Sequence, residues 1–262
     1  RLRGRCDGYL RGTIEWSDGK DYPGEGNIGE GYQGSDYFDG LMNLALCYQV
    51  ARHSDETRAR AFGRRGAELL FKMSETSGPH APDPLRNSGY AIRFFGAGMA
   101  FGYDWLYDAL DSAQQSGAPS KDGEGRARIR AALQRWFDAY EKKGFGHEHP
   151  QGNYFAGYYA AKGLAGLALR GEDPAGTWED FLQRVHRGFV APYYAEHLRG
   201  GGWPEGWNYG PLGAQNMSLP LWAARTALGL DLSTTPPPYR YPLEQGAYLL
   251  HFTWPSRMTL DD

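Results

Sequence analysis

The stretch from Gly200 to Gly210 reads Gly-Gly-Gly-Trp-Pro-Glu-Gly-Trp-Asn-Tyr-Gly and interrupts a chain that is otherwise patterned for helices. Glycine is costly to order in a helix and proline removes a backbone donor, so the stretch predicts a shaped loop. Its rings and polar groups are Trp203, Trp207, Glu205, Asn208 and Tyr209. Flat rings beside a few polar groups suit a sugar ring, and loops are enriched in function. The alternative is an aromatic plug that only packs the loop.

Helical spacing of apolar residues surrounds this loop on both sides. The predicted helices span about 36–50, 55–73, 88–110, 124–142, 153–169, 174–197 and 214–228. Residues 1–35 have no long apolar period and are expected to be rich in loops. A proline-rich linker at 233–238 separates the helices from residues 247–254, which are expected to form a β-strand.

The predicted helices alternate in character along the chain. Those starting near 36, 88, 153 and 214 are rich in Gly, Ala and aromatic residues, whereas those starting near 55, 124 and 174 carry charge on one face. Small residues suit a crowded inner ring and charged faces suit an outer one. The sequence therefore predicts a mainly α fold: an incomplete α/α toroid over residues 36–232, a loop-rich segment at 1–35, and the start of a β-sandwich at 233–262. The loops near Gly24, Gly144 and Gly200 are expected on one rim.

Composition narrows the classes of partner. The net charge is −3, so no basic surface for a nucleic acid is indicated. No apolar run reaches the roughly 20 residues of a membrane span. The chain starts at Arg1 without a Met or a signal peptide, so we expect a processed protein or part of a longer one. Its two cysteines, Cys6 and Cys47, leave one disulfide open, and the oligomeric state is not specified.

Three stretches, taken in order, resemble the α/α-toroid domain of the heparinase II/III-like polysaccharide lyases, a group that includes oligoalginate lyases. The segment 101–108, Phe-Gly-Tyr-Asp-Trp-Leu-Tyr-Asp, resembles a Tyr-Asp-Trp-Leu helix of that family. Gly152-Asn153-Tyr154 resembles its Asn-His helix start, and residues 201–209 resemble its Gly-x-x-x-Glu-Gly-x-x-Tyr loop. The likeness covers roughly residues 36–232, and it is the combination in this order that carries it.

The resemblance implies β-elimination on an acidic polysaccharide or oligosaccharide and a periplasmic or secreted location. It implies no cofactor in this chain, and leaves a structural metal to a downstream β-domain. Two departures stand out. Tyr154 occupies the position where the family has a histidine, and only the start of the following β-sandwich is expected here.

A uronate lyase must neutralise the substrate carboxylate, remove the neighbouring proton and protonate the leaving oxygen. Asn153, at a helix start, suits the donor role, and otherwise it is a plain helix cap. Tyr209 is the candidate base, acid or both. A free tyrosine titrates near about 10, so it would need neighbouring donors or cations. Its alternative role is packing.

His147 and His149 flank Glu148 just before Asn153. Such a pair can bind metal or supply a base, or it can simply be solvated. His149 is preferred as a catalytic candidate because it is nearer to Asn153. Glu205 either orients Tyr209 or accepts hydrogen bonds from the loop backbone.

Arg93 is a charge inside an aromatic helix, so it either pairs with an acid such as Asp104 or binds a uronate. The candidate substrate-binding residues are Trp203, Trp207, Asn208, Tyr154, Tyr158 and Arg93. Tyr154 and Tyr158 share one helix face, which a core stripe explains equally well.

Two other functions remain open on the sequence alone. A glycoside hydrolase would need two carboxylates about 5–10 Å apart, which Glu205 with Asp36, Asp39 or Glu30 could supply. A non-catalytic glycan-binding toroid is favoured by Tyr154 and by the short β-region.

Overall fold

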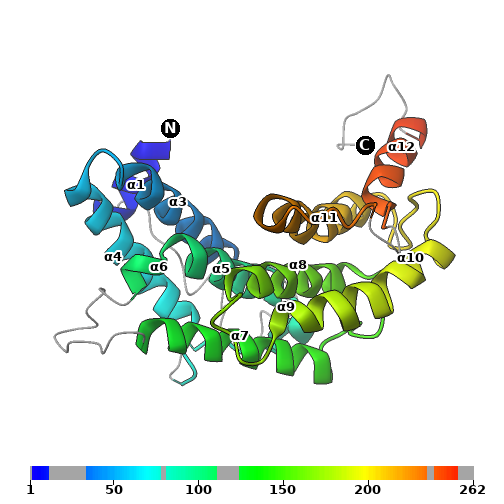
Figure 1. Cartoon of the computed structure of the whole chain (residues 1–262), viewed down its shortest axis with the longest axis horizontal. Coiled ribbons are helices and arrows are strands. Elements are labelled where there is room, and N and C mark those ends of the chain that lie inside the picture. The colour runs from blue at the N-terminus through cyan, green and yellow to red at the C-terminus, as the bar shows by residue number, and fades with distance from the viewer. Residues whose placement is uncertain (1, 12–33, 78–80, 111–123, 235–238, 253–262) are drawn as a thin grey trace.

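The computed structural model describes residues 2–11, 34–77, 81–110, 124–234 and 239–252 (Figure 1). Within these ranges the chain is helical and has no strand, which confirms the mainly α class. The elements are α1 (Leu2–Arg11), α3 (Ser35–Ala51), α4 (Glu56–Met73), η1 (Arg86–Gly89), α5 (Ile92–Trp105), α6 (Tyr107–Leu110), α7 (Glu124–Lys143), α8 (Asn153–Ala168), α9 (Thr177–Asp180), η2 (Phe181–Val190), α10 (Ala191–His197), α11 (Tyr209–Leu228) and α12 (Tyr241–Phe252).

Four helices form one row in chain order. Helix α5 packs against α3 and α8, and α8 packs against α11. The N-terminal ends lie together, because Tyr37 on α3 is 5.7 Å from Phe95 on α5, ring to ring, and Arg93 on α5 bonds Asn153 on α8. Asn153 in turn bonds Glu205, just before α11. The four helices are therefore parallel, and their N-termini share one edge.

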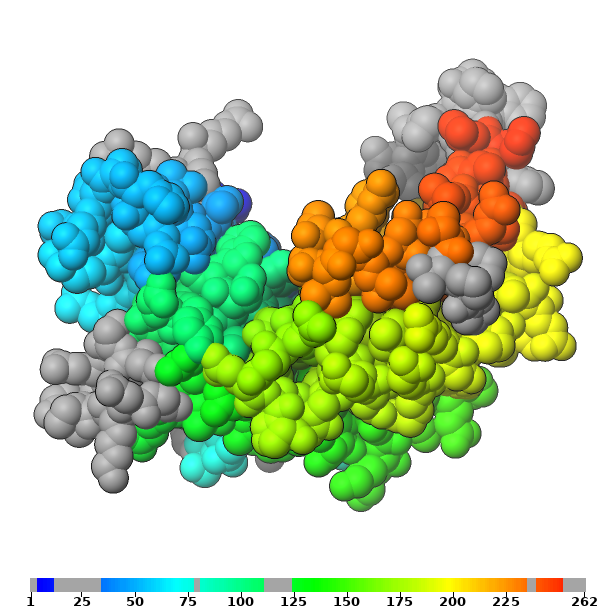
Figure 2. All heavy atoms as spheres, in the orientation of Figure 1, coloured from blue at the N-terminus to red at the C-terminus, as the bar shows by residue number. Residues whose placement is uncertain are grey.

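The charged helices form a second row behind this one. Helix α4 packs on α3, α7 packs on α5 and α8, and α9 with η2 packs on α8 (Figure 1). Large side chains such as Trp136, Tyr103 and Tyr159 are fully buried. Figure 2 shows the surface hollowed between α3 and α11. In the first row, the C-terminal ends of α5, α8 and α11 line a pocket of about 300 Å³.

Glycines let α8 approach its neighbours on both sides. A Cβ atom placed on Gly157 would lie 2.7 Å from Cβ of Arg93 on α5. One placed on Gly163 would lie 2.5 Å from Cβ of Pro220 on α11. Both distances are far below van der Waals contact, so the small-residue pattern of α8 is what permits the row of parallel helices.

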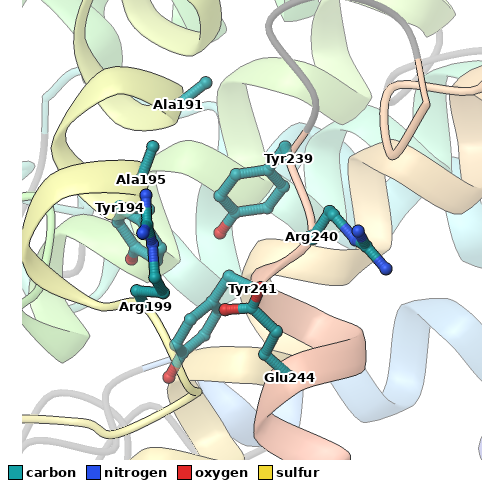
Figure 3. A pocket seen from close by; sticks show the side chains of 8 residues that line it. All are labelled: Ala191, Tyr194, Ala195, Arg199, Tyr239, Arg240, Tyr241 and Glu244. Atoms are coloured by element: carbon teal, nitrogen blue, oxygen red, sulfur yellow. The ribbon is translucent and has the colours of Figure 1, made fainter.

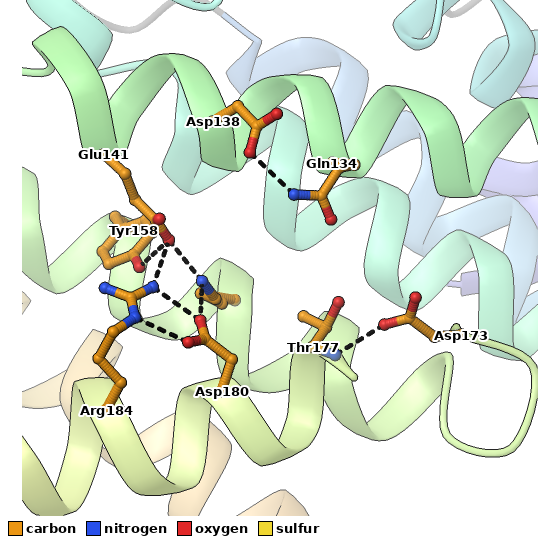
Figure 4. Close-up of polar contacts among 9 residues, drawn as sticks. Gln134, Asp138, Glu141, Tyr158, Asp173, Thr177, Asp180 and Arg184 are labelled. Carbon is orange, nitrogen blue, oxygen red and sulfur yellow. Dashed lines mark hydrogen bonds and ion pairs between the residues drawn. The ribbon is translucent and has the colours of Figure 1, made fainter. Parts of the chain in front are cut away.

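A buried ion-pair network fixes α8 to the second row (Figure 4). Lys162, 5% exposed, contacts Glu141 on α7 and lies 2.5 Å from Asp180 on α9. Arg184 joins the same carboxylates at 3.0 and 2.7 Å. The hydrogen bond from Arg184, together with Lys162, lowers the pKa of Asp180 to about 2. A lysine is tolerated inside this helix pair because its charge is fully paired.

The expected β-strand at 247–254 is wrong up to residue 252, where α12 ends; residues 253 and 254 lie outside the described ranges. Tyr241 and Gln245 are buried four residues apart, which is helical spacing. Gln245 Nε2 donates to Gly210 O at 2.8 Å and to the Tyr241 hydroxyl at 2.9 Å. Docking against α11 therefore selects a helix for this apolar run.

Three other expectations are corrected. Part of the loop-rich segment 1–35 is helix α1, while residues 12–33, which include Glu30 and most of the loop expected near Gly24, lie outside the described ranges. The expected helix 174–197 contains η2, a π-helical segment with wider turns. Helix α11 starts at Tyr209, earlier than expected, with Pro211 tolerated in its first turn, where backbone N–H groups lack helical partners.

Cys6 and Cys47 form a disulfide that joins α1 to α3. The sequence alone had left this pairing open. Among the helices of the described ranges, none combines the length and the apolar character needed to cross a membrane.

Candidate functional site

Asn153 is the first residue of α8 and lies inside the helix rather than capping it. The cap position is Gly152, which has extended backbone angles and no side-chain cap bond. The Asn153 side chain, 5% exposed, instead reaches across to two other elements. Its Oδ1 accepts from Arg93 Nη2 at 2.8 Å, and its Nδ2 donates to Glu205 Oε1 at 2.9 Å. The plain helix-cap role is therefore excluded.

Glu205 fastens the Gly200–Gly210 loop to the start of α8. Its Oε2 accepts from the Asn153 backbone N–H at 2.7 Å, and its Oε1 accepts from the Asn153 amide. Trp203 Nε1 donates to the same Oε2 at 2.9 Å. The first N–H groups of a helix have no partner within it, so a carboxylate there is doubly favoured. The three bonds make Glu205 the centre of the site.

Arg93, on α5, is 5% exposed and hydrogen-bonds Asn153. Its Nη2 also donates to the Asn153 carbonyl at 2.6 Å, and its Cζ lies 3.8 Å from the centre of the Tyr90 ring. Burial lowers the pKa of Arg93, with Tyr90 and then other nearby groups, Glu205 included, opposing the shift. Its Nε and Nη1 are buried without a hydrogen-bond partner. The guanidinium therefore has two buried donors that no acceptor uses within the described ranges.

The expected pairing of Arg93 with Asp104 is wrong. The two residues are eleven positions apart on α5, a rise of about 16 Å along a helix. Asp104 instead lines the pocket at the opposite end of the row, where burial raises its pKa. Asn153 is the residue that hydrogen-bonds Arg93, and the Tyr90 ring covers the guanidinium.

Tyr154 and Tyr209 complete the edge of the site. Burial raises the pKa of Tyr154, Arg93 opposes the rise, and Tyr209 and Glu205 add to it. The Tyr154 ring packs edge-on against Tyr90 at 5.0 Å. Tyr209, the first residue of α11, is 46% exposed. A half-buried tyrosine and an exposed one therefore lie near the buried Asn153 amide and the exposed Glu205.

The two tryptophans of the loop have different roles. Trp203 is 8% exposed and packs against Tyr194 and Tyr241, so it belongs to the core beneath the loop. Trp207 is 41% exposed, with its ring 6.2 Å from that of Tyr248. Asn208 is exposed directly before α11. Trp207 and Asn208 are therefore exposed next to Tyr209, where a ligand could contact them.

Two candidates lie apart from this cluster. The side chain of His149 is exposed, and its backbone closes the turn that precedes α8 through bonds to Gly146 and Gly152. Tyr158 is 2% exposed, stacks on Tyr140 at 4.9 Å, and donates to Glu141 at 2.5 Å. Its ring therefore packs in the core towards α7, as the core-stripe alternative had it.

The His147–Glu148–His149 turn has no metal-binding geometry. His147 Nδ1 donates to the Gly144 carbonyl at 2.9 Å, and its Nε2 is 3.6 Å from Glu148. In the part of the chain that the structure describes, no three His, Cys, Asp or Glu residues are grouped to hold an ion. Burial raises the pKa of Tyr9 in α1, Arg5 opposes the rise, and Asp39 and Asp36, the acids of the hydrolase alternative, add to it.

Sequence reasoning missed Tyr90 and Phe145. Tyr90 covers the Arg93 guanidinium, and Phe145, 63% exposed, packs edge-on against Tyr154 at 5.2 Å. The spacing of three between Tyr90 and Arg93 was a usable signal, because such residues lie on the same face of a helix. No local signal marks Phe145, since its contact with Tyr154 depends on how the 144–152 turn folds.

Comparison of the chain with models of protein families, with curated proteins and with solved structures finds no match.

Proposed function

We propose that this chain is the helical part of a polysaccharide lyase that cleaves a uronate-containing glycan by β-elimination. The observation that carries the proposal is the hydrogen-bonded set Arg93–Asn153–Glu205 beside the exposed Tyr209. It combines a buried cation, an amide donor and a phenol at one edge of the molecule. These are the group types that stabilise a developing carboxylate charge and move a proton.

The direction of the helices supports an anionic substrate. Parallel α3, α5, α8 and α11 present their N-termini at the same edge, and each N-terminus carries about half a positive charge. One amide hydrogen of Asn153 is used by Glu205, and an amide group has a second. In the proposed mechanism, this hydrogen and Arg93 bind the uronate carboxylate. Tyr209 exchanges the proton and Trp207 stacks on a neighbouring sugar.

Two further features agree with the proposal. The parallel row backed by charged helices fits an arc of an α/α toroid, with the small-residue helices inside. The Cys6–Cys47 disulfide fits a secreted or periplasmic protein, because disulfides persist in oxidising compartments. Both features would also fit other helical glycan-active proteins, so the chemistry is what must be tested.

The test is product formation by the full-length protein on alginate, heparin-type and chondroitin-type glycans, followed by ultraviolet absorbance of the unsaturated uronate. We expect a signal on at least one polymer. Tyr209→Phe should lower kcat by about 100-fold or more, as for loss of a general acid–base group. Tyr193→Phe, on α10, is the matched control and should retain activity. No signal on any polymer, or cleavage without a new double bond, would contradict the proposal.

A non-catalytic glycan-binding role is the second candidate. It is favoured by the structural use of Glu205, whose carboxylate already accepts three hydrogen bonds from the protein. In that case Tyr209→Phe would leave oligosaccharide binding intact and no turnover would be found on any substrate. Trp207→Ala would weaken binding, since sugar stacking on an exposed indole would be lost.

A further inference from the structure

Two cavities in the described part of the chain differ in how free their walls are. The cavity between α10 and the start of α12, about 270 Å³, is lined by Tyr194, Tyr239 and Tyr241 (Figure 3). These tyrosines are 1–3% exposed and pack ring against ring, so they belong to the core. The Glu244 carboxylate beside them accepts from Gly200 N at 2.9 Å. Packing therefore fixes most of these walls, whereas the pocket at the C-terminal ends of α5, α8 and α11 has partly exposed ones.

The pocket at the C-terminal ends of the row is large enough for a small ligand. Its volume of about 300 Å³ lies at the lower end of the range of about 300–1,000 Å³ for small-molecule sites. The side chains larger than alanine that line it are Phe101, Asp104, Trp105, Leu164, Leu167 and Thr226. The other lining residues are alanines, whose small side chains leave the space between the helices unfilled. Phe101 and Trp105 are partly exposed, with ring centres 5.5 Å apart, so a ligand in the pocket can contact both rings.

Asp104 is the one ionisable residue among the described residues that line this pocket. Its side chain has no hydrogen bond or ion pair within the described ranges. The Thr226 hydroxyl is used elsewhere, because it donates to the Trp222 carbonyl at 3.0 Å. Burial raises the pKa of Asp104, as expected for a carboxylate beside apolar walls without a cation. The pocket therefore holds one unpaired negative charge.

Three parallel helices end at the pocket and add to its negative potential. Helix α5 ends at Trp105, α8 at Ala168 and α11 at Leu228, and residues of the last turn of each line the pocket. The C-terminus of a helix carries about half a negative charge, so an acidic side chain in the last turn is unfavourable. Asp104, in the last turn of α5, therefore lowers the stability of the free protein. A bound cation would offset this repulsion.

We propose that this pocket binds a small organic ammonium ion. The Asp104 carboxylate pairs with the charge, and the Phe101 and Trp105 rings contact the alkyl groups around the nitrogen, as aromatic side chains do with ammonium ligands. A metal ion is disfavoured because hard cations take about six or more oxygen ligands, and this pocket has one carboxylate among apolar walls. The site lies about 22 Å along α8 from Asn153, so it does not rest on the proposed function.

The test is calorimetric titration of the full-length protein with choline and, separately, with 3,3-dimethyl-1-butanol, which has the same shape but no charge. Choline should bind in the millimolar range and at least about tenfold more tightly than the alcohol, because only choline carries a positive charge. Asp104→Asn should weaken choline binding by about tenfold, and Trp105→Leu, which keeps an apolar side chain but removes the ring, by several-fold. Glu179→Gln, at an exposed glutamate on α9, is the matched control and should bind choline normally.

Urea unfolding separates a binding role of Asp104 from a structural one. Asp104→Asn should be at least as stable as wild type, since an unpaired carboxylate at a helix C-terminus is removed, and choline should stabilise wild type more than the variant. Tyr209→Phe should leave choline binding unchanged, because Tyr209 starts α11 and the pocket lies at the other end of that helix. Equal binding of the alcohol, normal choline binding by Asp104→Asn, or no binding by wild type in the millimolar range would overturn the proposal. An Asp104→Asn variant less stable than wild type would overturn it too, because Asp104 would then serve the fold.

Discussion

Glu205 is the residue on which the attachment of the loop to α8 depends. Its two oxygens accept from the Asn153 backbone, the Asn153 amide and the Trp203 indole. In Glu205→Gln one acceptor becomes an NH₂ group, so at least one donor loses its partner. We expect the free energy of unfolding in urea to fall by about 1–2 kcal/mol.

The control for this substitution is Glu179→Gln on α9, an exposed glutamate without a hydrogen bond or ion pair within the described ranges. Its stability should stay within about 0.5 kcal/mol of wild type. If Glu205→Gln unfolds at the same urea concentration as this control, then the carboxylate does not hold the loop. Trp203 would in that case be positioned by its aromatic neighbours alone.

The sequence predicted candidate site residues, of which the structure brings Asn153 and Glu205 together, but it did not predict their pairing. Asn153, Glu205 and Tyr209 stand out because amide, carboxylate and phenol interrupt Gly- and Trp-rich stretches. The partner predicted for Arg93, Asp104, was wrong. Asp104 was considered because it is close in sequence, whereas the observed partner, Asn153, is sixty residues away. Partner choice depends on which helix N-termini meet, and that is a tertiary property.

Helices were predicted well where an apolar stripe is long, as in α4 and α7. The stripe fixes both the type and the buried face of such an element. The failures are short elements whose conformation is decided by a neighbour. Helix α12 follows from docking on α11, and α1 from the disulfide with α3. The π-turns of η2 also carry no signal in apolar spacing.

The π-helical segment η2 contains the buried histidine His186. Its Nδ1 lies 2.7 Å from the Tyr159 hydroxyl on α8, and the Tyr239 ring packs edge-on against it. Burial, and next the charge of Arg187, lower the pKa of His186 to about 4. In the unfolded chain a histidine titrates near about 6.5. Between these values the unfolded state binds a proton that the folded state does not.

Stability should therefore fall as the pH falls from about 6.5 to about 4, by roughly 3 kcal/mol from this residue. The measurement is urea unfolding at pH 7 and at pH 4.5, for wild type and for His186→Phe. The variant should lose much of the pH dependence whatever its absolute stability. An unchanged slope would show that His186 is protonated in the folded protein. Asp180, with its pKa lowered from 3.8 to about 2, stabilises the folded state at both of these pH values. That stabilisation is lost only as the pH falls further, towards 2.

The molecule as a whole is a curved row of parallel helices backed by charged ones, and its N-terminal end is held covalently. Helix α1 packs on α3 and α4 and buries Cys6 and Tyr9. Asp7 pairs with Arg58 on α4. A ten-residue helix is marginal by itself, so these contacts and the Cys6–Cys47 bond keep it in place.

The disulfide joins residues 41 positions apart, and closing a loop of this length removes about 4 kcal/mol of unfolded-state entropy at 25 °C. We expect a reductant to lower the free energy of unfolding of wild type by about 2–4 kcal/mol. A Cys6→Ala/Cys47→Ala double variant should show the same loss and no further response to reductant. The edge at Asn153 is built from α5, α8 and the loop before α11, so cleavage of the glycan substrate should persist after reduction. Loss of cleavage on reduction would mean that the row transmits strain from α1 to that edge. Equal stability with and without the disulfide would mean that packing alone orders α1.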